Sequence, residues 1–121
     1  MPLEVTLKPG DCIYIGTTKV VVRSSEYTRL AIEGTLPVLR EGDYVELGES
    51  PSKARQLYVM LQASYMRGDF DKCQMEYAER ASELLRSCPE SAFVVAAINS
   101  WLGRGNLYKA LKAARPLADL D

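Results

Sequence analysis

The chain has 121 residues, 47% hydrophobic and 26% charged, which is typical of one compact soluble domain or of two small units sharing a core. Its 15 Lys and Arg residues are balanced by 16 Asp and Glu residues, which excludes a globally basic nucleic-acid clamp of the histone type. Histidine is absent, so Ser–His–Asp catalysis, Cys–His catalysis and histidine-ligated zinc sites are excluded as well.

The first part of the chain alternates apolar and polar side chains in short runs, a pattern typical of β-strands. Turn residues such as Pro9-Gly10-Asp11 and Gly34 separate the runs. The turn Glu41-Gly42-Asp43 leads into a last alternating run at 44–47. We expect about five strands in all, drawn from the runs at 3–7, 13–15, 20–22, 30–32, 36–40 and 44–47.

From Ser50 onwards the apolar residues recur at three- and four-residue spacing, which indicates helices. Ser50 followed by Pro51 predicts the first N-cap, because the serine oxygen accepts an unpaired backbone N–H and proline has no N–H to leave unpaired. Gly68, Pro89 and Gly103 predict the ends of successive helices. The pattern therefore predicts about four helices.

These patterns divide the chain into two modules. We expect an α+β protein, with a small antiparallel β module at 1–49 followed by a bundle of about four helices at 50–121. Within the helical module, residues 68–73 resemble residues 105–110 at an offset of 37. We interpret the similarity as the same turn chemistry in two helical hairpins, and a true repeat of the tetratricopeptide kind is the alternative.

Basic and aromatic side chains gather in the second module. Residues 1–49 hold five basic and eight acidic residues, whereas residues 50–121 hold ten basic and eight acidic residues. The last predicted helix is crowded with cations, namely Arg104, Lys109, Lys112 and Arg115. They are interpreted either as a solvated face near a helix C-terminus or as a contact strip for phosphates or an acidic partner, helped by Trp101 and Tyr108. Aromatic residues at helical spacing are more often part of the hydrophobic core than of a recognition surface. In this chain they are Tyr58, Tyr65, Phe70, Tyr77, Phe93, Trp101 and Tyr108, and we expect them to be buried.

No constellation typical of an enzyme emerges. The carboxylate pairs Glu41/Asp43 and Asp69/Asp71 fall in predicted turns, where such side chains usually bind backbone N–H groups. The calcium-loop, phosphate-loop and dinucleotide motifs are absent, and three scattered cysteines indicate reduced thiols. There is no apolar stretch of about 18 residues and no secretory start. We expect a cytoplasmic binding or regulatory protein that is not an enzyme, uses no cofactor or metal, and does not associate with a membrane.

Five strings of the chain are informative when they are taken in order, namely Met1-Pro-Leu-Glu-Val-Thr-Leu-Lys-Pro-Gly10, Arg29-Leu-Ala-Ile-Glu33, Pro37-Val-Leu-Arg-Glu41, Ser50-Pro51 and Tyr108-Lys-Ala-Leu-Lys112. Together they resemble the FlbT family of bacterial regulators of flagellin synthesis. The resemblance runs over essentially the whole length. It implies a cytoplasmic protein that associates with the 5′ untranslated region of flagellin mRNA and promotes its degradation or blocks its translation, with the opposite sign in some relatives. It also implies a companion, FlaF, a small helical flagellin-secretion factor.

The β module alone is similar to the CsrA family of mRNA-binding repressors, through the gapless run from Leu3 to Gly16 and the strings around Arg29 and Arg40. This resemblance implies a strand-swapped dimer whose first and last strands together present basic residues to an RNA loop. Lys8 matches one of two adjacent first-strand arginines, Leu7 replaces the other, and Arg40 matches the last-strand arginine. If the first and last strands are neighbours, Lys8 and Arg40 converge on one edge.

The sequence therefore predicts a post-transcriptional regulator that binds the flagellin mRNA leader. The candidate RNA-binding residues are Lys8, Arg40, Arg104, Lys109, Lys112 and Arg115. For Lys8 and Arg40 the alternative is two surface cations beside acidic residues, each pair contributing little. For the whole chain the alternative is an adaptor or chaperone that binds FlaF or flagellin and affects mRNA only indirectly. A homodimer would cover the open edges of so small a sheet.

Overall fold

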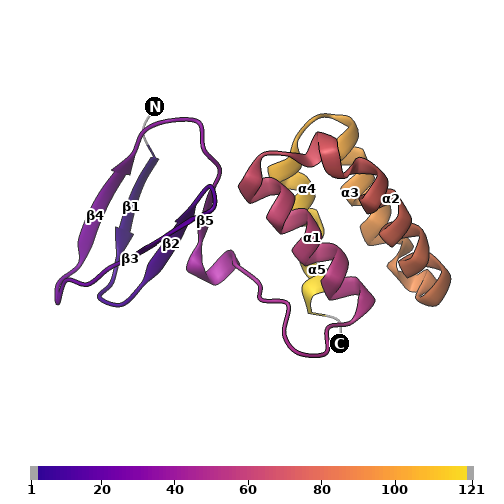
Figure 1. Cartoon of the computed structure of the whole chain (residues 1–121), viewed down its shortest axis with the longest axis horizontal. Coiled ribbons are helices and arrows are strands. Elements are labelled where there is room, and N and C mark those ends of the chain that lie inside the picture. Colours follow the sequence, from indigo (N-terminus) through magenta and orange to yellow (C-terminus); the bar gives the residue numbers. More distant parts are fainter. Residues whose placement is uncertain (1–2, 120–121) are drawn as a thin grey trace. The chain divides into compact units, whose positions relative to one another are not determined.

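A computed structural model describes residues 3–119. The contacts group the chain into two compact units: residues up to Tyr44 together with Met66–Gly68, and Val45–Tyr65 together with the residues from Asp69 onwards. They are called here the β unit and the helical unit. The predicted α+β class is confirmed, because a set of antiparallel strands precedes a set of helices along the chain (Figure 1).

The five strands form two antiparallel sheets (Figure 1). They are β1 (Leu3–Leu7), β2 (Cys12–Ile15), β3 (Thr18–Val21), β4 (Thr28–Ile32) and β5 (Val38–Arg40). One sheet pairs β1 with β4, with Val5 opposite Leu30. The other has the order β3-β2-β5, so that Ile13 of β2 lies opposite both Val20 and Arg40. The strands therefore occupy five of the six alternating runs in the sequence.

The alternation in β1 decides which of its side chains enter the core of the β unit. Val5 and Leu7 are buried, whereas Glu4 and Thr6 are exposed. The buried cluster is completed by Ile13 and Val22, and the half-buried side chains that pack against it are Val20, Leu30, Ile32 and Val38. An isolated two-stranded sheet is marginal in water. Packing of apolar side chains from both sheets into one cluster therefore stabilises the β1–β4 pair.

The sixth alternating run, at 44–47, is not a strand, although its spacing predicted one. Residues Glu41–Asp43 form a 3₁₀ turn, and the chain then runs without a strand partner. The side chain of Gln62 takes the place of that partner. Its Oε1 accepts the Val45 N–H at 2.9 Å and its Nε2 donates to the Val45 carbonyl at 2.8 Å. One buried amide thus satisfies both backbone groups that a neighbouring strand would satisfy.

The helical unit is built from four helices and one short final helix. They are α1 (Lys53–Arg67), α2 (Phe70–Ser87), α3 (Ala92–Gly103), α4 (Leu107–Ala113) and α5 (Arg115–Ala118), with a 3₁₀ turn at Pro89–Ser91 before α3. Their shared core is apolar, and its most buried members include Leu57, Leu61, Leu84, Ile98, Leu111 and Leu117. The Tyr77 hydroxyl donates to Asn99 Oδ1 at 2.6 Å, and burial raises the pKa of Tyr77 to about 12.

Two details of the helix boundaries differ from the sequence prediction. The first helix is capped by Ser52, not Ser50, because Ser52 Oγ accepts the N–H of Arg55 at 3.1 Å. The last predicted helix is divided, with α4 ending at Ala113 and α5 beginning at Arg115. Pro116 explains the division, since it lacks a backbone N–H and its ring clashes with the preceding helical turn.

Candidate nucleic-acid interface

The basic and aromatic residues at the junction of α3 and α4 form cation–π contacts around two rings, Trp101 and Tyr108. Arg104 Cζ lies 5.0 Å from the ring centroid of Trp101, and Lys109 Nζ lies 4.7 Å from the same centroid. Lys112 Nζ lies 5.3 Å from the ring centroid of Tyr108. These distances are within the range of favourable cation–π contact. The five residues are called here the cation–aromatic cluster.

The turn between α3 and α4 brings the cluster together. Trp101 lies in the last turn of α3, and the Trp101 carbonyl accepts the N–H groups of Arg104 and Asn106 at 3.1 and 3.0 Å. Gly105 has φ 74°, a conformation that favours glycine and reverses the chain. Asn106 Oδ1 then accepts the N–H of Lys109 at 3.0 Å, which caps α4. The first turn of α4 is thereby fixed beside Trp101.

Substitution of the cap is expected to cost stability. Asn106→Ala removes the acceptor for the Lys109 N–H and should lower the free energy of unfolding by about 1 kcal/mol. Asn106→Asp keeps an acceptor oxygen at the same place and should remain within about 0.5 kcal/mol of the parent chain. Urea unfolding followed by circular dichroism measures both. Equal stability of the alanine and aspartate variants would contradict a capping role.

The cations of the cluster are available to an anionic ligand. Arg104, Lys109 and Lys112 are exposed, and within residues 3–119 none of them forms a salt bridge with a carboxylate. Trp101 is half-buried and Tyr108 is 42% exposed, so both residues keep some solvent-accessible surface. Cations held over rings lose less side-chain freedom when they bind a phosphate than freely rotating ones do. The arrangement can therefore grip phosphate and offer aromatic surface to a base.

The remaining predicted RNA-binding residues belong to different units, the helical unit for Arg115 and the β unit for Lys8 and Arg40. Arg115 begins α5 and is half-buried, unlike the three exposed cations of the cluster. Lys8 directly follows β1 and Arg40 ends β5, and both are exposed. The condition under which Lys8 and Arg40 would converge on one edge is not met within the chain, because β1 pairs with β4 and β5 pairs with β2. Lys8 also has the Asp11 carboxylate close by, accepting its backbone N–H at 3.0 Å.

The sequence prediction that the aromatic residues form core is correct for some of them only. Tyr58 and Tyr77 are buried, with 2% and 7% of their surface exposed. Phe93 is 90% exposed, and Tyr108 is exposed within the cation–aromatic cluster. An aromatic residue at helical spacing thus marks a helix face without deciding whether that face is covered.

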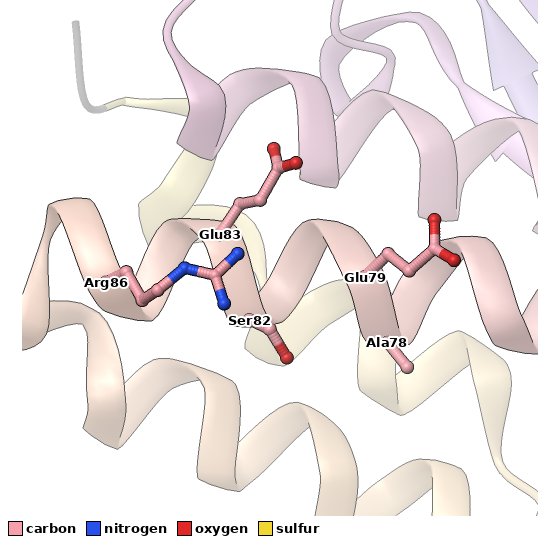
Figure 2. Close-up of a pocket in the computed structure, with 5 residues that line it drawn as sticks. All are labelled: Ala78, Glu79, Ser82, Glu83 and Arg86. Atoms are coloured by element: carbon pink, nitrogen blue, oxygen red, sulfur yellow. The ribbon is translucent and has the colours of Figure 1, made fainter.

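Other parts of the described chain offer less specific chemistry. An open depression of about 360 Å³ lies along α2 and is lined by Ala78, Glu79, Ser82, Glu83 and Arg86. Figure 2 shows that the carboxylates of Glu79 and Glu83 point to the same side. The charges of this depression are solvated and of mixed sign, unlike the enclosed apolar pockets that hold small ligands. No group of three metal-binding side chains is found among residues 3–119. Within that range no helix is both long and apolar enough to span a bilayer.

The thiol of Cys88 is held by a neighbouring carboxylate. Its Sγ donates to Glu90 Oε1 at 3.0 Å, and this hydrogen bond raises the pKa of Cys88 and lowers the pKa of Glu90. Cys12 is buried in β2, and burial is the largest cause of its raised pKa. Because the thiolate is the reactive form, these two environments disfavour nucleophilic chemistry.

Comparison with known proteins gives consistent matches over the whole chain. A family model described as "Flagellar protein FlbT" matches residues 3–121. The "Probable flagellum biosynthesis repressor protein FlbT" of Rhodopseudomonas palustris (strain TIE-1) is 34% identical over 117 residues, which cover 97% of this chain and 92% of the relative. The "Probable flagellum biosynthesis repressor protein FlbT 1" of Bradyrhizobium diazoefficiens is 32% identical over 118 residues, covering 97% and 80% of the two chains. No solved structure matches.

Proposed function

The chain belongs to the FlbT family, whose curated members are named as flagellum biosynthesis repressors, and we propose that it regulates flagellum biosynthesis by binding the 5′ untranslated region of flagellin mRNA. Binding to the leader blocks its translation, and the untranslated message is then accessible to nucleases. On this proposal the protein acts in the cytoplasm, where the message is, and it performs no bond chemistry itself.

The cation–aromatic cluster is the observation that supports this proposal. Proteins recognise single-stranded RNA with aromatic faces, on which bases stack, and with Arg and Lys side chains, which bind phosphates. Arg104 and Lys109 over Trp101, and Lys112 over Tyr108, combine both elements at the junction of α3 and α4. The planar guanidinium of Arg104 also has donors enough to bind phosphate while it stacks. Arg115, half-buried beyond the end of α4, would contribute at the margin of this surface.

Lys8 and Arg40 form a second proposed contact, on the β unit. Both are exposed, and each lies at the end of a strand. Because their strands pair with different neighbours, the two cations are proposed to bind RNA separately and not as one strand edge. Asp11 beside Lys8 reduces the local positive potential, so this contact should be weaker than the cluster.

Exposed apolar side chains favour a second candidate function, that of an adaptor for FlaF or flagellin. Phe93 on α3 is 90% exposed and Met75 on α2 is 79% exposed. Large apolar side chains at such exposure are more typical of protein contacts than of RNA contacts. On this alternative the effect on mRNA is indirect.

An electrophoretic shift experiment separates the two functions. The purified full chain is titrated against labelled flagellin leader RNA and against an unrelated RNA of equal length, with and without FlaF. We expect the chain alone to shift the leader, with an affinity that falls as salt rises, at a log–log slope of about −2 if three phosphates are contacted. A shift that needs FlaF would instead support the adaptor. Equal binding of both RNAs would contradict recognition of the leader.

A further inference from the structure

One face of α3 is apolar and open to solvent. No residue from Ala92 to Gly103 carries a charge, although a helix that is exposed on one side normally does. α3 buries Val95 and Ile98 in the core of the helical unit. On its other side Phe93, Ala97 and Ser100 recur at four- and three-residue spacing and are exposed, and Ala96 lies next to them. Phe93 is 90% exposed, so this apolar face has no cover within its own unit.

The two ends of this face carry opposite charges. Glu90 comes three residues before Phe93, and Arg104 comes eleven residues after it, about three helical turns and about 16 Å further along. Glu90 and Arg104 are both exposed, and neither forms a salt bridge within residues 3–119. Between them the large side chain, Phe93, lies near the negative end, and the small ones lie at the middle and near the positive end. The face is therefore complementary to itself when it is turned end for end.

We propose that a second copy of this chain covers the face, with the two α3 helices packed antiparallel about a two-fold axis near Ala97. In that arrangement Phe93 packs against Ser100 of the partner subunit, where the small side chain leaves room for the ring. Glu90 lies opposite Arg104 of the partner subunit, and the pair occurs twice by symmetry. Ala96 and Ala97 at the axis allow the helices to approach closely.

The charges also select the antiparallel arrangement against the parallel one. A parallel pair would place Glu90 beside its own copy and Arg104 beside its own copy, and like charges repel. Antiparallel helices additionally align their dipoles favourably. One helix face buries little area compared with an obligate interface, so the dimer should be reversible and concentration-dependent. The guanidinium of Arg104 has five donors and can bind the carboxylate while it stacks on Trp101.

Sedimentation equilibrium of the full chain tests this arrangement. We expect the parent chain to change from monomer to dimer as its concentration rises. Phe93→Glu should weaken the dimer at least about 100-fold, because the apolar contact with Ser100 of the partner subunit is lost twice and two carboxylates are placed in the interface. Met75→Glu is the matched control, since it replaces another exposed apolar residue of the same unit and should leave the dimer intact. Both variants should remain folded, because the substituted positions are exposed, and circular dichroism checks this.

Charge reversal tests the pairing itself. Glu90→Arg and Arg104→Glu should each weaken the dimer about tenfold, since each variant places like charges together at two symmetric positions. The double variant restores opposite charges and should return to within about threefold of the parent. A parent chain that stays monomeric, a dimer that survives Phe93→Glu, or a double variant no better than the single ones would each overturn the proposal. RNA binding by a strictly monomeric chain would overturn it without affecting the proposed function.

Discussion

Replacing Arg104, Lys109 and Lys112 together with glutamine is expected to weaken binding of the flagellin leader on the order of 100-fold. The three side chains are exposed and lie over the rings of Trp101 and Tyr108, so their loss removes the phosphate contacts and leaves the fold in place. The salt dependence should fall together with the affinity. If each cation neutralises one phosphate of a single strand, the log–log slope should become shallower by about 2.

The matched control removes the same amount of positive charge elsewhere in the helical unit. Lys53, Lys72 and Arg86 are exposed on α1 and α2, and glutamine at all three should change the affinity less than about threefold beyond the general effect of net charge. A third variant, Lys109→Gln with Lys112→Gln, keeps Arg104 and therefore the proposed dimer contact. Because it removes two of the three cations, it should lower the logarithm of the RNA affinity by about two thirds as much as the triple variant does. If the cluster variant and the control lose equal RNA affinity, the binding is explained by non-specific charge attraction and not by the cation–aromatic cluster.

The proposed contact on the β unit is measured in the same titration. Lys8→Ala with Arg40→Ala should weaken binding less than the cluster variant does, because within residues 3–119 neither cation lies over an aromatic ring and Asp11 lies close to Lys8. Unchanged affinity and an unchanged salt slope would remove Lys8 and Arg40 from the interface.

Replacing Gln62 with alanine is expected to lower the free energy of unfolding by about 3 kcal/mol. Gln62 is 2% exposed, and its amide makes both hydrogen bonds to Val45. The variant leaves the Val45 N–H and carbonyl without partners in a buried place and also leaves a cavity. Gln62→Leu fills most of that volume but still lacks the two hydrogen bonds, so it should recover only the cavity part of the loss. Urea unfolding measures both variants.

The control for this prediction is Gln74→Ala. Gln74 is exposed on α2 and donates to the Asp71 side chain at 3.4 Å. Its removal should change stability by less than about 0.5 kcal/mol. A Gln62→Ala variant as stable as Gln74→Ala would show that the hydrogen bonds to Val45 are replaced by water.

Local signals in the sequence predicted most of the elements. Gly68, Pro89 and Gly103 correctly marked helix ends, because glycine and proline act through their own backbone geometry. The strand predicted at 44–47 was wrong. The hydrogen-bonding partner of Val45 is the side chain of Gln62, which lies 17 residues further along the chain, and no local sequence pattern shows such a pairing. The pairing of β1 with β4 and of β5 with β2 is likewise long-range, and alternation within a strand does not specify its neighbour.

The sequence indicated which residues belong to the candidate site but not how they are arranged. The spacing of Lys109, Lys112 and Arg115 suggested one continuous strip on a single helix, but Pro116 ends that helix early and separates Arg115. The stacking on Trp101 depends on the turn at Gly105 and Asn106, which brings two helices together. The open face of α3 was not predicted from the sequence, because the spacing of apolar residues indicates a helix without showing which of its side chains are covered.

Arg104 lies directly after α3 and belongs both to the cation–aromatic cluster and to the positive end of the open face. Because the two binding events share Arg104, they are linked thermodynamically. If dimerisation changes the affinity for the transcript by some factor, binding of the transcript changes the dimerisation constant by the same factor. The concentration of the protein would then set how tightly each molecule binds the transcript, with no additional component required.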